Sequence, residues 1–504
     1  MKFKTFLSLV RYGGINNLFT NMKNYNSILE SNLFDEVFYQ NNYDCGGMDP
    51  LIHYMFKGVR EHNTPSFEFD TFQYLKNNPD AIDTNPILHS LSNGKNSYKI
   101  DKYEWLDEIK NRNLDNLTNF DFSEEPLVSI IILNKNGLNH LKRLFKDFKE
   151  NTNYNNYEII VVDNNSTDDS VNYLKSLDLP IKVIENSKNK SFSEANNDGV
   201  KESNGELILL MNNDIETTYG WLNELVGTLL NNENVGGVGP KLIYPYFLDN
   251  REESYTIQSA GDSFFDALDC YKPDNAYKGI NLWDSSVNEL IDVVGITGAV
   301  FLTTREIYEK LNGLDETYYY CYEDVDFCLK LNEAGYRILY CPNSLVIHYE
   351  SPTRKLDNNL RENIKINRET LNEKWGDYLF KHILENRLDN NLFYTLDKLK
   401  IAIIDNSKMD IDNIVNSLND EYEVNIFDLD KFKFDLDADI IISFNPEYDP
   451  LKVESKINTL KIAWILDNHN EWEDQLDFYD IIIDSKDNSL DEFKKNVKEN
   501  VGIT

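Results

Sequence analysis

Between residues 126 and 350, short apolar runs typical of β-strands alternate with helical patterns, which limits the fold more than any other feature of the sequence. Short runs of this kind are typical of strands that are buried on both faces of a sheet. Their alternation with helices predicts an α/β domain with a parallel, doubly wound sheet. The predicted elements are the strands Val128–Leu133, Tyr157–Asp163, Ile181–Glu185, Glu206–Met211 and Ile291–Leu302, a helix over about Asp324–Ala334, and a strand Ile338–Cys341.

One of these runs ends in a carboxylate, because Leu207–Met211 continues into Asn212, Asn213 and Asp214. In open α/β sheets, ligands bind just beyond the carboxyl ends of the strands. A carboxylate at such an end can hold Mg²⁺ or Mn²⁺ against a diphosphate. On its own, Asp214 could equally be a polar cap between strand and loop, so this run leaves both interpretations open.

Two further strand ends lead to the same edge of the predicted sheet. The first strand runs into Asn134 and the second ends at Asp163. Since parallel strands bring their carboxyl ends to one edge, these residues predict a nucleotide pocket next to Asp214. Asp163 can accept hydrogen bonds from a pyrimidine or a ribose, or it can form an Asx-turn with the residues that follow it.

Composition limits the function and the location of the chain. Its 504 residues are enough for roughly three domains. A formal net charge of −36 argues against nucleic acid as a partner, although a bound metal can neutralise a diphosphate locally. Five cysteines without a Cys-x-x-Cys pair fit a reducing cytoplasm. No stretch reaches the ~18 apolar residues of a membrane span, so we expect a cytoplasmic protein, either free or peripheral at the inner face of the cell membrane.

The N-terminal region divides into three segments: an amphipathic helical segment at 1–30, a repeat region at 31–100 and a linker at 101–125. In the first segment, Phe3, Phe6, Leu7 and Val10 share a helical face; packing on the next domain is favoured over a membrane anchor, and no signal-peptide cleavage site is evident. The repeat region places equivalent residues 35–36 positions apart, which predicts two helical units. The equivalent His53 and His89 are expected to pack within their own repeats rather than to form a metal or catalytic pair.

The C-terminal region begins with a charged helical linker at 351–397. A second alternation of strands and helices follows at 398–504 and predicts another Rossmann-like α/β unit. Its predicted strands are Ile401–Asp405, Val424–Phe427, Asp439–Phe444, Lys461–Asp467 and Asp480–Asp484.

Five ordered strings within 126–350 carry a resemblance to a known family. They read VSIIILNKNG, EIIVVDNNSTDDS, NKSFSEANNDGVKESNGELILLMNND, GITGAVFLTTREIYEKLNGLDE and YEDVDFCLKLNEAGYRILYCPNSLVIHYES. Together they resemble the family 2 glycosyltransferases with the GT-A fold, most closely the rhamnosyltransferase-like branch. The resemblance implies a Rossmann-like mixed sheet flanked by helices, and metal-dependent transfer of a sugar from a nucleotide diphosphate with inversion at the anomeric carbon.

The resemblance also implies a donor site. Asp163 matches the family's nucleobase-binding aspartate, and Asn134 and Asn213 are the expected nucleotide-binding residues beside it. The string from Asn212 to Asp214 matches the family's Asp-x-Asp element, with Asp214 facing the metal and Asn212 replacing the first aspartate. His348 resembles a histidine that completes the metal site in some members, and imidazole suits Mn²⁺ better than Mg²⁺. A packed core histidine is the alternative.

On the acceptor side, Glu323-Asp324-Val325-Asp326 matches the family's Glu-Asp-x-Asp motif, which makes Asp324 the expected general base. Inverting transfer needs one base that takes the proton of the attacking hydroxyl. Glu323 and Gly298 are the expected acceptor-binding residues. A carboxylate at a helix start could instead serve only the helix dipole, and a glycine there could mark only a strand bulge.

Two details concern the loops of this site. Tyrosines 318, 319, 320 and 322 precede the base, where the family carries aromatic residues that stack on sugars. Ser191 stands where the branch usually has glycine, which leaves the geometry of that loop open.

The expected donor is dTDP-rhamnose or a UDP-sugar, and the expected acceptor is a hydroxyl of a growing cell-surface glycan or lipid-linked glycan. The repeats resemble segments found ahead of such domains in surface-glycan enzymes, and 398–504 resembles the acceptor-side half of a GT-B transferase in a longer protein. A sugar-nucleotide pyrophosphorylase is disfavoured because Asn134–Leu138 lacks a glycine-rich loop with Arg and Lys. A non-catalytic carbohydrate-binding or scaffold module is disfavoured by the intact Asp214, Asp324 and His348.

Overall fold

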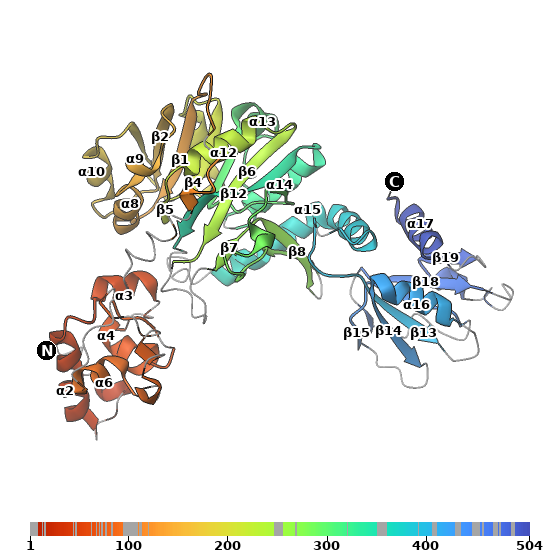
Figure 1. The fold of residues 1–504 in the computed structure, drawn as a ribbon, viewed down its shortest axis with the longest axis horizontal. Helices are drawn as coiled ribbons and strands as arrows, with labels where there is room; N and C mark the ends of the chain where they lie inside the picture. The colour runs from red at the N-terminus through yellow and green to blue at the C-terminus, as the bar shows by residue number, and fades with distance from the viewer. Residues whose placement is uncertain are drawn as a thin grey trace.

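The computed structural model of the chain shows three parts that follow one another, with the N-terminal helices and the C-terminal sheet on opposite sides of the central domain (Figure 1). No helix in the described part of the chain is long and apolar enough to span a membrane. The structure describes residues 9–12, 14, 17–43, 45, 48–61, 63–66, 68–69, 71, 74–75, 78–81, 84–93, 109, 113–118, 120–245, 256–267, 270–319, 321–349, 360–391, 393–405, 411–428, 435–445, 454–455, 458–466, 472, 475–484 and 489–503.

The N-terminal helices reproduce the sequence repeat as a repeated tyrosine–histidine contact. Tyr39 Oη lies 3.0 Å from His53 Nδ1, and Tyr74 Oη lies 2.7 Å from His89 Nδ1. Each histidine therefore packs within its own repeat, as predicted, whereas Phe3, Phe6 and Leu7 lie outside the described residues. The helices are α2 (Leu18–Glu30), α3 (Glu36–Asn42), α4 (Pro50–His53) with the π-helical turn Tyr54–Gly58, the 3₁₀ turn Pro79–Ala81, and α6 (Pro86–Ser92).

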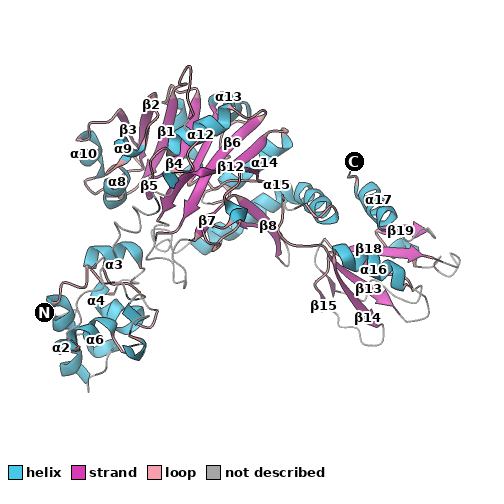
Figure 2. Cartoon of the chain, viewed as in Figure 1, coloured by secondary structure: helices cyan, strands magenta, loops and turns pink. Residues whose placement is uncertain are grey.

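The central domain is built on one ten-stranded mixed sheet (Figure 2). Its order is β10-β12-β6-β11-β4-β1-β2-β3, while β5 pairs with β12 and β7 pairs with β6. Strands β1, β2, β3 and β4 are parallel, but β11 runs antiparallel to β4 and β6. The strands are β1 (Val128–Asn134), β2 (Tyr157–Asp163), β3 (Ile181–Glu185), β4 (Leu207–Asn212), β5 (Ile215–Thr217), β6 (Val235–Ile243), β7 (Ile257–Ser259), β10 (Ile291–Asp292), β11 (Val300–Thr304) and β12 (Arg337–His348).

This topology confirms the mixed α/β fold class and corrects three predictions drawn from the residue pattern. The sheet is not entirely parallel, because apolar periodicity does not encode strand direction. The predicted strand over 291–302 is two strands separated by a turn, and β12 extends well beyond the predicted 338–341. Strand β6 was not predicted because its glycines and proline disfavour strands. At Gly239 a Cβ atom would lie 2.1 Å from Ile296 Cγ2, so glycine permits this close approach.

Helices cover both faces of the sheet, which explains why its strands are apolar on both sides. In β1, Ile131 joins the core under α11, α13 and α14, while Ile130 and Ile132 join the core under α8, α9, α10 and α12. The helices are α8 (Leu138–Leu144), α9 (Phe148–Asn151), α10 (Ser170–Lys175), α11 (Phe192–Lys201), α12 (Trp221–Leu230), α13 (Arg305–Lys310) and α14 (Glu323–Glu333), with a 3₁₀ turn at Ser285–Val287.

A long helix, α15 (Leu360–Leu388), packs on the hairpin of β8 (Asp262–Ala267) and β9 (Cys270–Asn275) and on α14. Its Trp375 lies in one apolar cluster with Tyr271 and Val325. Near its end, Arg387 Nη1 lies 2.8 Å from both Asp266 and Asp439, and so connects the hairpin to the C-terminal unit.

The C-terminal unit is a parallel five-stranded sheet in the order β14-β13-β16-β18-β19. This order is the 2-1-3-4-5 arrangement of doubly wound folds. All five predicted strands are present, although Asp467 lies outside the described residues. The elements are β13 (Lys400–Asp405), α16 (Asp412–Glu421), β14 (Glu423–Asp428), β15 (Asp435–Leu436), β16 (Ile440–Ser443), β17 (Glu454–Ser455), β18 (Leu460–Ile465), the 3₁₀ turn Leu476–Phe478, β19 (Ile481–Asp484) and α17 (Leu490–Val501).

Because Lys241 of β6 is buried, the stability of the central domain should vary with pH in the alkaline range. Lys241 is 2% exposed, and burial lowers its pKa from 10.5 to about 8. Between these values the unfolded chain binds the additional proton, so stability should rise with pH over this interval. Below pH 8 the charged amine destabilises the fold by up to roughly 3 kcal/mol. Lys241→Met should therefore raise the melting temperature at pH 7, and this gain should shrink toward pH 10. An equal gain at both pH values in calorimetry would contradict the prediction.

Candidate functional site

A cavity of about 350 Å³ opens at the carboxyl ends of the first strands of the central sheet. Six of the predicted site residues line it: Asn213, Asp214, Gly298, Glu323, Asp324 and His348. Asn134 and Asp163 are not among its lining residues. The remaining lining residues are Leu133, Lys135, His140, Asn164, Asn189, Lys190, Ser191, Phe192, Asn212, Thr297, Ala299, Tyr319 and Cys321.

Asp214 and His348 form a buried pair at one wall of this cavity. Asp214 follows β4 and His348 ends β12, and the antiparallel pairing of His348 with Ile215 of β5 brings the two side chains together. His348 Nε2 lies 3.3 Å from Asp214 Oδ1. On the other side of the ring, His348 Nδ1 lies 2.8 Å from Gln258 Oε1. With the ring proton on Nδ1, the Nε2 lone pair faces Asp214, as a metal ligand requires.

The chemistry of this pair fits a divalent metal that is held only in part by the protein. Within the described ranges, no group of three or more His, Cys, Asp or Glu side chains is arranged to hold a metal ion. One carboxylate oxygen and one imidazole nitrogen suit Mn²⁺ and leave the other coordination positions to oxygens of a phosphate ligand. Asn212, which replaces the expected first carboxylate, places Nδ2 3.4 Å from His348 Nε2.

Asn134 and Asp163 lie beneath the cavity, where their polar atoms bond to each other. Asn134 Nδ2 donates to Asp163 Oδ1 at 2.9 Å, and Asn134 Oδ1 accepts from Asn213 Nδ2 at 2.9 Å. Asp163 Oδ2 accepts from the backbone N–H of Ser166 at 2.8 Å, which is an Asx-turn. Both side chains are at most 2% exposed, and Asn134 positions Asn213, which lines the cavity.

Asp324 also lines the cavity, from the first turn of α14. Its Oδ2 accepts from the backbone N–H of Gly298 at 2.6 Å, and its Oδ1 accepts from the N–H of Val325 at 2.9 Å. A Cβ atom at position 298 would lie 3.3 Å from Asp324 Cβ. Glycine therefore lets the 297–299 turn approach the carboxylate and fix its orientation. Glu323, which is 6% exposed, lies beside it in the cavity wall.

The loop that leads into α14 is strained. Cys321 and Tyr322 have φ values of +70° and +72°, in the left-handed region that favours glycine. Such strain persists where the surroundings over-determine it, often at functional sites. Of the predicted aromatic residues, Tyr319 is 51% exposed and lines the cavity, whereas Tyr318 and Tyr322 pack in the cluster with α15. Tyr320 lies outside the described residues.

Several lining residues were not predicted as site residues. Lys135 Nζ donates to the carbonyl of Asn164 at 2.8 Å, and Lys190 forms an ion pair with Asp198. Each lysine comes shortly after the end of a predicted strand. This position is a signal in the sequence that could have identified both lysines as site residues. His140 lies in a helical pattern that predicts only packing; burial lowers the pKa of its imidazole, and the nearby Asp214 partly offsets that effect.

The structure shows the geometry of the loop at Ser191, which the sequence left open. Its Oγ accepts from the backbone N–H of Glu194 at 3.1 Å, and Glu194 Oε2 accepts from the N–H of Ser191 at 2.9 Å. This reciprocal pair is a capping box that starts α11 at the edge of the cavity.

Residues 129–284 of the central domain match the family model described as glycosyl transferase family 2, the family that the sequence resemblance implies for this part of the chain. The branch within the family remains a prediction.

Relatives match about half of the chain. It is 30% identical over 264 residues to the uncharacterized protein y4gI of Sinorhizobium fredii, covering 51% of this chain and 28% of that protein. It is 29% identical over 245 residues to the O-antigen biosynthesis protein RfbC of Myxococcus xanthus, covering 46% of this chain and 18% of that protein. A crystal structure of GalNAc-T7 with UDP, GalNAc and Mn²⁺ matches with a TM-score of 0.37 and 18% identity, over 45% of this chain and 44% of that one. The chain spans less than a third of the length of these two curated relatives.

Proposed function

We propose that this chain is an inverting, metal-dependent glycosyltransferase that moves a sugar from a nucleotide-diphosphate donor to a hydroxyl of a growing cell-surface glycan. One observation carries the proposal: the Asp214–His348 pair and Asp324 line a single cavity. The match of residues 129–284 to glycosyl transferase family 2 supports the same reaction class. A relative named for O-antigen biosynthesis supports a surface-glycan acceptor.

On the donor side, Asp214 and His348 would hold Mn²⁺ or Mg²⁺. The metal, when bound, would neutralise the charge of the departing diphosphate. Asn134, Asp163 and Asn213 would contact the nucleotide, and Asn134 bonds to both of the other two side chains. Lys135 and Lys190 line the same cavity and would add positive charge near the phosphates. This charge matters in a chain whose net charge is −36.

On the acceptor side, Asp324 would act as the general base. As the acceptor hydroxyl oxygen bonds to the anomeric carbon, the bond from that carbon to the diphosphate breaks and the hydroxyl proton moves to Asp324. Attack on the face opposite the leaving group inverts the anomeric carbon. The N–H of Gly298 holds the carboxylate in place for this step, and Glu323 would orient the acceptor.

The proposal also covers the donor sugar, the acceptor, the location in the cell and the roles of the two flanking regions. Branch resemblance favours dTDP-rhamnose, with UDP-sugars next, and a glycan or lipid-linked glycan as acceptor. A cytoplasmic location, with peripheral contact at the inner face of the membrane, would give access to such acceptors. The parallel sheet of the C-terminal unit agrees with the proposed acceptor-side half of a GT-B transferase. The N-terminal repeats would serve as an accessory segment.

A donor screen tests the proposal. The full chain is incubated with dTDP-rhamnose, UDP-glucose, UDP-GlcNAc or GDP-mannose in Mn²⁺, Mg²⁺ or EDTA, and release of the nucleoside diphosphate is measured. We expect metal-dependent release from at least one donor, and faster release when oligosaccharide acceptors are added. Absence of donor binding in calorimetry, together with binding of glycan alone, would support the carbohydrate-binding module instead.

A further inference from the structure

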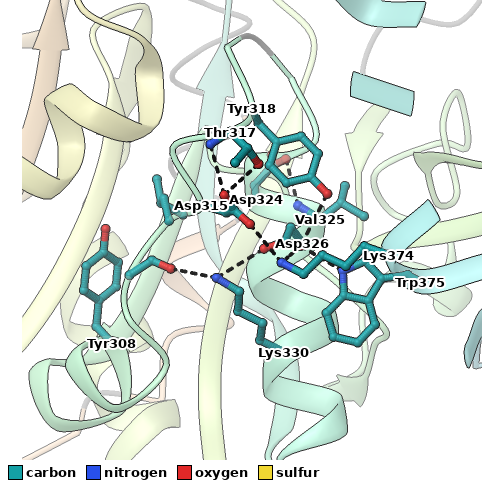
Figure 3. Close-up of polar contacts among 12 residues, drawn as sticks. Tyr308, Asp315, Thr317, Tyr318, Asp324, Val325, Asp326, Lys330, Lys374 and Trp375 are labelled. Carbon is teal, nitrogen blue, oxygen red and sulfur yellow. Dashed lines mark hydrogen bonds and ion pairs between the residues drawn. The ribbon is translucent and has the colours of Figure 1, made fainter. Parts of the chain in front are cut away.

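A buried carboxylate at the start of α14 is held by residues of α15, far along the chain (Figure 3). Asp326 is fully buried, and its Oδ1 accepts from Trp375 Nε1 at 2.8 Å and lies 2.7 Å from Lys374 Nζ. Its Oδ2 lies 3.2 Å from Lys330 Nζ. The Tyr318 hydroxyl completes the set at 3.4 Å from Oδ1. The side chain of Asp326 in α14 therefore contacts residues of α14 itself, of α15 and of the loop before α14.

The charges in this cluster balance. Lys374 also donates to Asp315 Oδ2 at 2.9 Å, and Thr317 donates to Asp315 Oδ1 through its backbone N–H and its hydroxyl. Together with this lysine, these bonds lower the pKa of Asp315 to about 2, against the opposing effect of burial. Two carboxylates thus face two lysines, and removing one lysine would leave a buried carboxylate without full compensation.

The same helix also holds the strained loop. Asn367 Nδ2 of α15 donates to the carbonyl oxygen of Cys321 at 3.1 Å. The next residue, Tyr322, accepts from the backbone N–H of Asp326 at 2.9 Å through its carbonyl oxygen. Since left-handed backbone at two consecutive non-glycine residues is costly, these contacts are what keep the loop in its observed conformation. That loop carries Cys321 into the cavity wall next to Glu323 and Asp324.

We propose that α15 is part of the catalytic unit and that Lys374 and Trp375 are positioning residues. By holding Asp326, they fix the first turn of α14, which carries Asp324 two positions earlier. This inference rests on the proposed role of Asp324 as the base. It extends the functional unit beyond the predicted 126–350 domain to a helix that begins at Leu360.

Three variants of the full chain test this inference: Trp375→Phe, Lys374→Met and Lys374→Arg. Trp375→Phe keeps an aromatic ring in the apolar cluster but removes the N–H donor together with part of the indole. We expect Trp375→Phe and Lys374→Met to lower kcat by about 10- to 100-fold, as expected for a misplaced catalytic group, with the donor KM within about twofold of the native value. Lys374→Arg keeps the charge and the donors and should restore most of kcat. The matched control is Lys365→Met, on the exposed face of α15, where Lys365 pairs with Glu369 of its own helix.

Hydrogen exchange of the peptide covering 315–326 gives a second measurement that needs no substrate. We expect faster exchange there in Trp375→Phe and Lys374→Met than in Lys365→Met. Unchanged kcat and unchanged exchange would overturn the inference, and so would a loss of kcat matched by an equal rise in donor KM and a general fall in melting temperature. If the native chain turns over no nucleotide sugar in the donor screen, the proposed function fails, and the exchange measurement still decides whether α15 holds the loop.

Discussion

Replacing Asp324 by asparagine is expected to lower kcat for sugar transfer by about 10²- to 10⁴-fold, the usual contribution of a general base. Asparagine keeps the size of the side chain and can still accept from the N–H of Gly298, so the turn at 297–299 should stay in place. What it cannot do is take the proton of the acceptor hydroxyl. The measurement is the initial rate of transfer at saturating donor and acceptor.

The donor KM of Asp324→Asn should change little, because the predicted nucleotide and metal residues lie at the ends of β1, β2, β4 and β12, whereas Asp324 lies in the first turn of α14. Glu333→Gln, at the exposed end of the same helix, is the matched control and should behave like the native chain. Native turnover in Asp324→Asn would remove this residue from the base role. The family assignment of residues 129–284 would remain, since it does not depend on that role.

Replacing Asp214 by asparagine is expected to lower transfer by about 100-fold or more, because a metal at a leaving diphosphate contributes several kcal/mol. Asp214 is 5% exposed and faces His348 at 3.3 Å, so its carboxylate is the one charged oxygen ligand that this pair can offer. Calorimetry should show that Mn²⁺ no longer strengthens donor binding. His348→Gln should show the same loss to a smaller extent, because Asp214 remains.

Asp178→Asn is the control for this prediction, since Asp178 is exposed and lies between α10 and β3. Its Mn²⁺ dependence should equal that of the native chain. Metal-dependent donor binding that survives in Asp214→Asn would contradict the metal assignment. In that case the pair would serve as a packed polar contact within the sheet, with His348 oriented by Gln258.

Local patterns were sufficient for many of the elements. Strands β1 to β4 and the five main strands of the C-terminal unit are short apolar runs, and the structure places their ends within two residues of the predicted ends. The same patterns placed Asp214 beyond a strand end and Asp324 at a helix start, and both line one cavity. These predictions succeeded because the burial of a strand or helix face is visible in the spacing of neighbouring apolar residues.

Asp163 shows where local reasoning reaches its limit. Its position at a strand end was predicted, but whether its carboxylate points to a ligand or into the protein depends on its neighbours in space. In the structure, each oxygen of Asp163 accepts one hydrogen bond, from Asn134 and from the N–H of Ser166, so the Asx-turn is present. Each carboxylate oxygen can accept a second hydrogen bond, so the contact of Asp163 with a nucleotide stays a prediction.

By itself, the sequence determined the order of most strands and helices, the resemblance of residues 129–284 to a known family, and the strand ends and helix starts that carry the carboxylates. The tertiary structure decided the direction of β11 and the place of the glycine-rich β6 in the sheet. It also decided the contact of Gln258 with His348 and the hydrogen bond from Trp375 of α15 to Asp326. Gln258 and His348 are 90 positions apart, and Trp375 and Asp326 are 49 apart. Periodicity reports which face of an element is buried, whereas contacts at such separations depend on which elements the fold packs together.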